Sequence, residues 1–161
     1  MPAKSNNANA HIIQQLNKIL SLEYASVVQY MQHSFLVGGH DRLVFSDFFR
    51  DQSKSSHKHA RVLGDKIVAL GGVPTVEPAT IHQSTDLQEM LEQDLKLERD
   101  ALDAYLKAWE LSSENHALRF LLESIIQEEQ IHVEEMEKLS AKNKIAAVSD
   151  KEKEIKLQRA V

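Results

Sequence analysis

Apolar residues recur at alternating three- and four-residue steps over most of the chain, which is the spacing of one face of an α-helix. The first two helical patterns end at glycine pairs, because glycine readily adopts the left-handed conformation that terminates a helix. Asp86 and Glu89 have the spacing of a capping box at the start of the third. The pattern therefore predicts four long helices, over about residues 8–37, 42–70, 86–112 and 115–141.

The lengths of the connections predict how these helices are arranged. The first two helices, and the last two, are joined by few residues, so each pair should be antiparallel neighbours. The stretch between the second and third contains Pro74 and Pro78 and has no helical period. About thirteen extended residues span ~40 Å, which matches the length of a helix of ~25 residues. One long crossover predicts a ferritin-like, all-α four-helix bundle; a plain up-down bundle with a loose loop is the alternative.

Polar residues occupy inward positions near the middle of every predicted helix. Midpoints of neighbouring helices lie side by side, so these side chains should converge at one level of the core. A buried carboxylate without a partner costs several kcal/mol, and a pair of divalent cations would neutralise several at once. A single inward glutamate or histidine is more often an ordinary structural residue, but a set at one height favours a metal site. The set is Glu23, His59, Glu98, Glu129 and His132.

Composition narrows the chemistry that such a site can perform. The 161 residues include eight histidines and no cysteine, which excludes disulfides and iron–sulfur clusters. Oxygen and imidazole ligands without sulfur favour iron or manganese and tolerate zinc. A net charge of −5 argues against nucleic acid as a partner. The chain has no apolar run long enough for a membrane span and no secretory signal, so we expect a cytoplasmic location.

Four stretches of sequence resemble the helix signatures of the bacterioferritins: LEYASVVQYMQH, KHARVLGDKIVALGGVPT, LQEMLEQDLKLERDA and EEQIHVEEME. The resemblance covers about residues 10–140. It implies a diiron centre with Glu23 and Glu98 as terminal carboxylate ligands and Glu129 as a bridging ligand. His59 and His132 would be the imidazole ligands, and Tyr30 would lie near the centre.

The second helix departs from the family pattern, which has Glu-x-x-His there as on the fourth helix. Ser56 stands three residues before His59, so one bridging carboxylate is missing. We therefore expect weakened or asymmetric metal loading and slower oxidation. Asp94, one turn before Glu98, is a candidate metal ligand that would compensate, and Gln52 is a weaker one.

His57 occupies the position of the methionine that binds haem at the dimer interface in bacterioferritins, and imidazole can also ligate haem iron. A surface histidine is the simpler interpretation.

Residues 1–9 are expected to form a flexible tail, 10–141 the bundle, and 142–161 a polar tail or short fifth helix. Ferritin shells of twenty-four subunits usually carry a fifth helix with an apolar face, whereas this last segment is short and polar. A dimer or a smaller cage therefore stays open beside the twenty-four-subunit cage.

The function that these features predict is oxidation of iron(II) by dioxygen or peroxide, coupled to iron storage in a homo-oligomer built from dimers. One alternative is another diiron or dimanganese enzyme, such as an oxidase, an oxygenase or a catalase-like protein. Another is a non-catalytic subunit of a mixed shell, which Ser56 favours. A DNA-protecting mini-ferritin is the least expected, because its usual site lies between subunits and its basic tail is missing from this sequence.

Overall fold

The structure, a computed structural model, describes residues 3–141. Its elements are α1 (Ala3–Leu36), the short 3-10 helix η1 (Gly39–Asp41), α2 (Arg42–Ala69), α3 (Leu87–Leu111) and α4 (His116–Ser140). No strand occurs within this described range, so the predicted all-α class is confirmed. The helix bounds agree closely with the sequence pattern except at the start: α1 is helical from Ala3, within the segment expected to be a tail. The expectation for residues 142–161 falls outside the described range.

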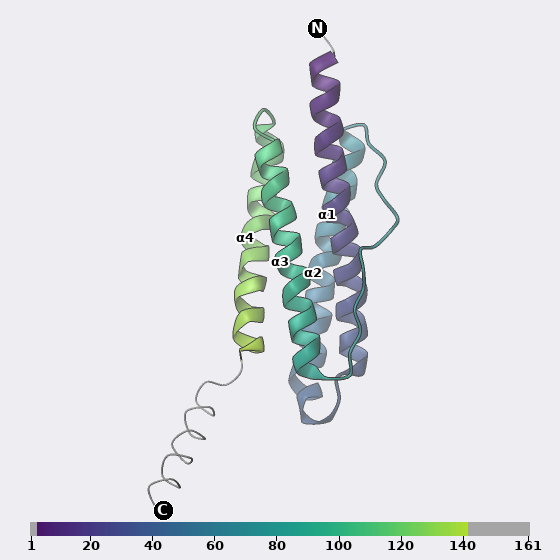
Figure 1. Cartoon of the computed structure of the whole chain (residues 1–161), viewed down its shortest axis with the longest axis vertical. Helices are drawn as coiled ribbons and strands as arrows, with labels where there is room; N and C mark the ends of the chain where they lie inside the picture. The colour runs from purple at the N-terminus through teal and green to yellow at the C-terminus, as the bar shows by residue number, and fades with distance from the viewer. Residues whose placement is uncertain (1–2, 142–161) are drawn as a thin grey trace, which may run out of the picture.

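The path of the chain is that of a ferritin-like bundle (Figure 1). Helix α1 is antiparallel to α2, and α3 is antiparallel to α4. Between α2 and α3 the chain crosses back along the length of the bundle beside α1, so α2 and α3 run parallel. The predicted connectivity is therefore confirmed, and the alternative of a plain up-down bundle is wrong.

Hydrogen bonds fix the crossover to α1. The Asn17 side chain donates to the carbonyl of Val73 at 3.0 Å and accepts from the amide of Thr75 at 2.7 Å. Farther along α1, the amide of Ala79 donates to the carbonyl of Ser21 at 2.8 Å. Backbone groups that have no partner within the crossover are satisfied in this way, which stabilises an extended segment without secondary structure.

The signals at the helix ends act largely as expected. Gly39 and Gly71 have φ angles of 63° and 86°, in the left-handed region that favours glycine. Asp86 caps α3, its side chain accepting from the amide of Glu89 at 2.9 Å. The reciprocal half of the capping box is replaced by a serine, since Ser84 donates to the Glu89 carboxylate and accepts from the Asp86 amide.

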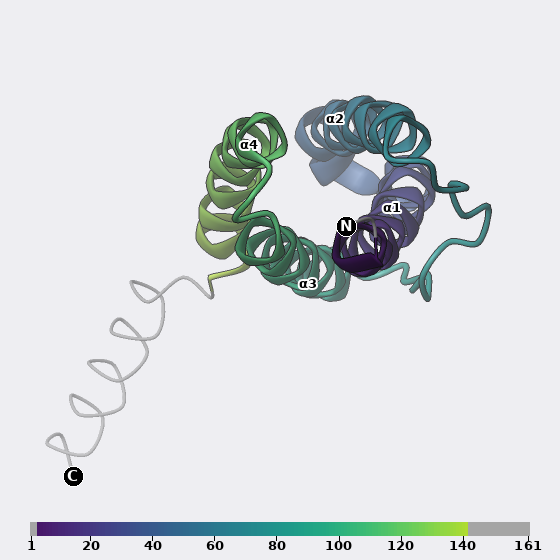
Figure 2. The ribbon, with the colours of Figure 1, turned by 90° about the horizontal axis from the view of Figure 1, so that it is seen from above.

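The buried interior has an apolar region on each side of a polar layer. One region includes Leu16, Leu63 and Leu122; the other includes Phe49 and Met136. Viewed from above, α1 lies between α2 and α3, and the ribbons of α2 and α4 stay farther apart than those of the other neighbouring helices (Figure 2). The polar layer contains buried polar side chains from all four helices.

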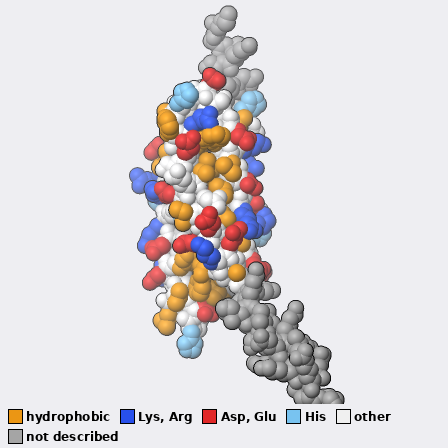
Figure 3. Space-filling view, turned by 90° about the vertical axis from the view of Figure 1, so that its left-hand side faces the viewer, with side chains coloured by type: hydrophobic (Ala, Val, Ile, Leu, Met, Phe, Trp, Pro, Cys, Tyr) orange, Lys and Arg blue, Asp and Glu red, His pale blue; other side chains and the backbone are white. Residues whose placement is uncertain are grey.

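The face of the molecule on the α4 side of Figure 1 carries interspersed acidic and basic side chains with apolar groups between them (Figure 3). No single sign of charge dominates this face. Within residues 3–141, none of the helices combines the length and the apolar character that crossing a membrane would require.

Candidate metal centre

Every helix of the bundle contributes to one cluster of acidic and imidazole side chains. Two sets of ligand atoms each lie within 4.8 Å of one another: Glu23, His59 and Glu129 in the first group, and Glu98, Glu129 and His132 in the second group. Glu129 belongs to both groups. The structure thus brings together all five residues that the sequence pattern placed at one level of the core.

The first group is tightly enclosed, with His59 in contact with two carboxylates. The His59 Nδ1 atom lies 2.7 Å from Glu129 Oε1 and 3.4 Å from Glu23 Oε1. All three side chains are buried. On the other side of the ring, Nε2 lies 3.1 Å from Oε2 of Glu128, which also binds Lys58. A carboxylate on the far nitrogen is the usual support of a metal-binding histidine, because it fixes the ring and its tautomer.

The second group is looser and more open to solvent. His132 Nδ1 lies 3.9 Å from Glu98 Oε2 and 3.7 Å from Glu129 Oε2. The His132 side chain is 16% exposed, whereas those of Glu98 and Glu129 are 3% exposed. Solvent therefore reaches the cluster on the side of His132.

Two buried tyrosines hold the outer carboxylates. The Tyr30 hydroxyl donates to Glu98 Oε1 at 2.5 Å, and the Tyr105 hydroxyl donates to Glu23 Oε1 at 2.6 Å. Burial, followed by the nearby carboxylates, raises the pKa of both tyrosines well above the ordinary value. Each hydroxyl therefore keeps its proton and acts as a donor, leaving the second oxygen of its carboxylate for another partner.

The cluster holds protons that a metal ion would replace. Burial raises the pKa of Glu23 to about 7 and that of Glu98 well above its usual value. Burial opposes the charge of His59, but Glu129 and Glu23 outweigh it and raise its pKa to about 11. The pKa of Glu129 is held well below the ordinary value, because its contacts with His132 and His59 overcome the effect of burial.

The donor atoms fit a pair of divalent cations. They are carboxylate oxygens and imidazole nitrogens, the ligand types that suit iron and manganese. His59 Nδ1 is buried and faces the carboxylates of Glu129 and Glu23. An imidazole nitrogen that lies among carboxylate oxygens is the arrangement in which a divalent ion can replace a proton. Glu129, shared by both groups, is placed to bridge two ions.

Comparison with known proteins agrees with this geometry. Residues 13–145 match the family model described as the ferritin-like domain. A bacterioferritin of Brucella melitensis is 32% identical over 133 residues, which cover 78% of this chain and 80% of that protein. The chain belongs to the ferritin-like family and is of the bacterioferritin type.

Two further proteins are similar to this chain. A solved structure of ferritin-like, diiron-carboxylate proteins from Bacillus anthracis str. Ames has a TM-score of 0.80 and 32% identity, covering 83% of this chain and 98% of that one. A nutrient stress-induced DNA-binding protein of Synechococcus sp. is 30% identical over 132 residues, which cover 74% of this chain and 75% of that protein.

Ser56 lies three residues before His59, at the position where the resemblance implied a bridging carboxylate. Its side chain is buried, with 6% of the residue exposed, and its hydroxyl donates to the Gln52 carbonyl of its own helix at 3.3 Å. Ser56 has no carboxylate and so supplies no bridging pair of oxygens to the cluster. The buried Oε1 atom of Gln52 has no hydrogen-bond partner among the described residues.

The structure does not bring Asp94 into the cluster, contrary to the expectation that it would compensate for Ser56. One oxygen of Asp94 accepts from Gln29 Nε2 at 2.8 Å, and the other lies 2.9 Å from His33 Nδ1. Gln29 in turn accepts from the amide of His82 in the crossover at 2.8 Å. Both oxygens of Asp94 are thus used to join α1, α3 and the crossover one turn away from Glu98.

His57 lies on the outside of α2, where it is exposed. It borders a surface pocket of about 400 Å³ with Tyr24, Arg61 and Pro74. The preference for a surface histidine over a haem ligand at His57 stays a prediction, and a Soret band in protein purified from haem-supplied cells would overturn it.

Sequence reasoning did not assign functional roles to Tyr105 and Glu128. Tyr105 follows Glu98 by two turns on the same inward stripe, a signal that was present. Glu128 lies on the flank of α4, where helical spacing indicates a solvated residue.

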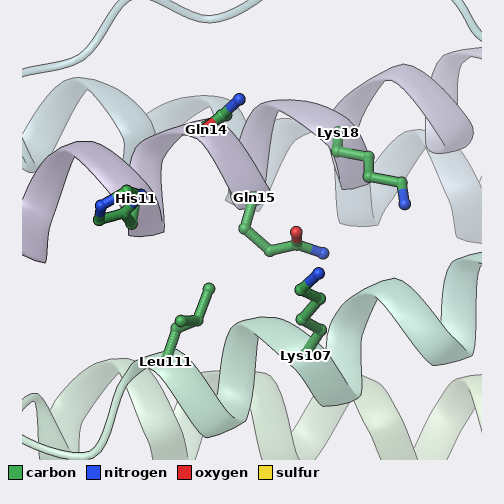
Figure 4. Close-up of a pocket in the computed structure, with 6 residues that line it drawn as sticks. All are labelled: His11, Gln14, Gln15, Lys18, Lys107 and Leu111. Atoms are coloured by element: carbon green, nitrogen blue, oxygen red, sulfur yellow. The ribbon is translucent and has the colours of Figure 1, made fainter.

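Several surface pockets lie away from the cluster. One, of about 500 Å³, lies between α1 and α3, where Lys18 and Lys107 extend from opposite helices near Gln15 (Figure 4). Gln15 is held by a hydrogen bond from its Nε2 to the carbonyl of Ala104 at 2.8 Å. This pocket shares no residue with either group of ligand atoms.

Proposed function

We propose that this chain binds two iron(II) ions within the bundle and oxidises them as the first step of iron storage. The observation that carries the proposal is Glu129, a single buried carboxylate that belongs to both groups of ligand atoms. A shared carboxylate holds two cations close together, so that both can give electrons to one oxidant. The first group would bind one ion and the second group the other.

The redox balance needs only the two ions and an oxidant. Each iron(II) gives up one electron, and dioxygen takes both electrons with two protons to become hydrogen peroxide. With peroxide as the oxidant, the same two electrons and two protons yield two molecules of water. The protons held by His59 and Glu23 before iron binds are released when the ligands become available to the metal.

The two positions should differ in affinity because their surroundings differ. The first group is buried, and the ring of His59 is supported by Glu128. The second group is more open and its ligand atoms are farther apart. Since Ser56 supplies no second bridging carboxylate, we expect an asymmetric centre in which the first group binds more tightly.

Storage also needs an assembly that encloses a cavity, and we propose a homo-oligomer. Helix α1 presents Val28, Met31 and Phe35 to solvent at helical spacing, and Phe35 is 59% exposed. An exposed apolar stripe of this kind favours association. A second proposal is that this chain is the less active subunit of a mixed shell, and Ser56 is the observation that favours it.

Nucleic acid is not part of the proposed function, although one relative carries a DNA-binding name. The net charge is −5, and the face in Figure 3 has acidic groups among its basic ones. Binding to a polyanion requires a concentration of positive charge.

Anaerobic titration with iron(II), followed by exposure to dioxygen, tests the proposal. Wild type should bind two ions per chain and oxidise both, and Glu129→Gln should lose most of this capacity. Glu135→Gln is the matched control, since Glu135 is an exposed carboxylate on the same helix. If Glu129→Gln binds and oxidises as much iron as wild type, the shared-ligand centre is wrong. Binding of two ions without oxidation would favour the less active shell subunit.

A further inference from the structure

Ser56 has the same relation to His59 that Glu129 has to His132, since each pair is separated by three residues on one face of its helix. On α4, the residue in that position is the carboxylate shared by both groups. The corresponding position on α2 therefore faces the same pair of metal positions. Ser56 places a short hydroxyl at this position, where a glutamate would place a carboxylate on a longer side chain.

The Ser56 hydroxyl does not fill this role. It donates to the Gln52 carbonyl, one turn back along α2, and is thereby held against its own helix. The side chain is buried, so the position lies inside the bundle and does not open directly to bulk water.

His59 follows Ser56 by one turn on the same face of α2. Its Nδ1 atom lies 2.7 Å from Oε1 of Glu129, the carboxylate that is shared by both groups. The face of α2 that carries Ser56 is therefore turned toward the bridging position.

The charge of the centre points to an anion as the missing group. Glu23, Glu98 and Glu129 supply three negative charges against the four positive charges of two divalent ions. Glu128 does not change this balance, because it is paired with Lys58 on the outer side of His59. One singly charged anion would make a loaded centre neutral, which matters in a buried site of low polarity.

We propose that a small free carboxylate or bicarbonate ion binds beside Ser56 and serves as the second bridging ligand of the metal centre. This inference rests on the proposed function, since the anion binds to a centre that already holds metal. Formate is a free carboxylate group of the kind that Ser56 does not supply, and bicarbonate presents the same pair of oxygens. The anion can enter from the side of His132, where the cluster is exposed. The dissolved anion thus supplies the second bridging carboxylate that Ser56 does not.

Cobalt(II) is a suitable probe because it takes the same ligands and can be followed by its absorption spectrum without turnover. The full-length protein is titrated with cobalt(II) in carbonate-free, non-coordinating buffer, alone and with millimolar formate, acetate or bicarbonate. We expect each small anion to tighten binding of the second ion about tenfold or more and to change the cobalt spectrum. Benzoate, which has the same charge but a bulky ring, should have no effect. The anion that tightens cobalt binding at the lower concentration, formate or bicarbonate, is the preferred co-ligand.

Two variants make the test specific to Ser56. Ser56→Glu should bind two cobalt ions without added anion, and formate should no longer change its affinity or spectrum. Ser56→Ala is the matched control and should keep the anion effect, because the hydroxyl that it removes is bonded to Gln52. The comparison of wild type with and without anion remains decisive even if Ser56→Glu folds poorly.

The outcomes separate this inference from the proposed function. If wild type binds two cobalt ions with the same affinity and spectrum with or without small anions, the anion site is wrong and the metal centre stands. An equal response to benzoate would likewise contradict a site of carboxylate size. If neither wild type nor folded Ser56→Glu binds two ions per chain, the proposed metal centre fails and the anion site fails with it.

Discussion

His59 is the residue on which the protonation of the cluster depends most. Its Nδ1 atom faces Glu129 and Glu23, and its Nε2 atom faces Glu128. Burial lowers the pKa of His59, but Glu129 and Glu23 outweigh this effect and raise it to about 11, so the ring is charged at neutral pH in the metal-free protein. A metal ion can bind to Nδ1 only after this proton leaves.

Metal binding should therefore release protons and become tighter as pH rises. At pH 7 we expect about one proton from His59 and a further fraction from Glu23 and Glu98, because burial raises the pKa values of both carboxyl groups. Calorimetry of zinc binding in buffers with different ionisation enthalpies measures this number. His59→Asn should release about one proton fewer. An affinity that does not change between pH 6 and pH 8 would contradict the prediction.

At the same scale, the sequence predicted which residues form the cluster but not how all of them are used. Helical spacing placed the five ligand candidates on inward faces at one height, and the structure brings them together. Spacing also put Asp94 on the face of Glu98, yet it could not show that Gln29 and His33 occupy both its oxygens. Such pairing depends on side-chain directions across helices, which periodicity along one helix does not contain.

At the scale of the element, the bounds and connectivity of the helices were largely predictable because their signals are local. Glycine at the ends, Asp86 at the start of α3 and the length of the crossover each act through backbone geometry. The start of α1 was not predicted, since its first residues are polar and show no apolar period. The hydrogen bonds between the crossover and Asn17 also join segments that are distant in sequence.

The junction of α2 with the crossover offers a test of this packing. A Cβ atom on Gly72 would lie 2.6 Å from Cγ2 of Ile13 in α1 and 3.0 Å from Cγ2 of Ile67. Since the branched side chain of Ile13 would have to shift, we expect Gly72→Ala to cost about 1–3 kcal/mol, or about 2–4 °C in Tm per kcal/mol. Thermal unfolding followed by circular dichroism measures this change.

Gly64→Ala is the control for the same substitution. Gly64 lies within α2, and no atom is within 4 Å of its added Cβ. Because alanine favours the helix over glycine, this variant should gain about 1 kcal/mol. Equal effects of the two substitutions would show that the contact between Gly72 and Ile13 is not tight.

The hydrogen bonds between the crossover and α1 allow a second test at the scale of the element. Asn17→Ala removes the two hydrogen bonds to Val73 and Thr75, which should loosen the crossover locally and cost about 1–3 kcal/mol. Limited proteolysis should cut this segment faster than in wild type. Lys18→Ala, at the neighbouring exposed position, should leave the rate unchanged. Unchanged cleavage of Asn17→Ala would mean that these bonds do not hold the segment.

At the scale of the whole molecule, the first group of ligands joins two helix pairs. It takes Glu23 and His59 from the pair formed by α1 and α2, and Glu129 from the pair formed by α3 and α4. All members of the second group come from α3 and α4. A metal ion in the first group would therefore tie α2 to α4, the two neighbouring helices whose backbones pack least closely.

Bound metal should thus raise the stability of the bundle and protect these two helices. A ligand at one hundred times its Kd adds about 2.7 kcal/mol, and a chelator should remove this gain. Hydrogen exchange should slow most in α2 and α4, around His59 and Glu129. In Glu129→Gln the protection should be lost. Protection spread evenly over the chain, or confined to α3 and α4, would contradict a tie between the two pairs.

Association is the other property of the whole molecule that can be tested. Light scattering on wild type should give a mass well above the 18.3 kDa of one chain. Phe35→Lys, which places a charge in the exposed apolar stripe of α1, should lower that mass. Gln14→Lys makes the same change of charge at an exposed position near the other end of α1 and should not. A monomeric wild type would remove the enclosed cavity from the proposed function.

The attachment of the crossover to α1 has a consequence for how the chain folds. Each antiparallel pair, α1 with α2 and α3 with α4, joins residues that are near in sequence and can form early. Bringing the pairs together requires closing the long loop between α2 and α3, which costs chain entropy and is slow. The first group of ligands is complete only after that step. Metal bound there would therefore act chiefly by slowing unfolding, while the folding rate stays nearly the same.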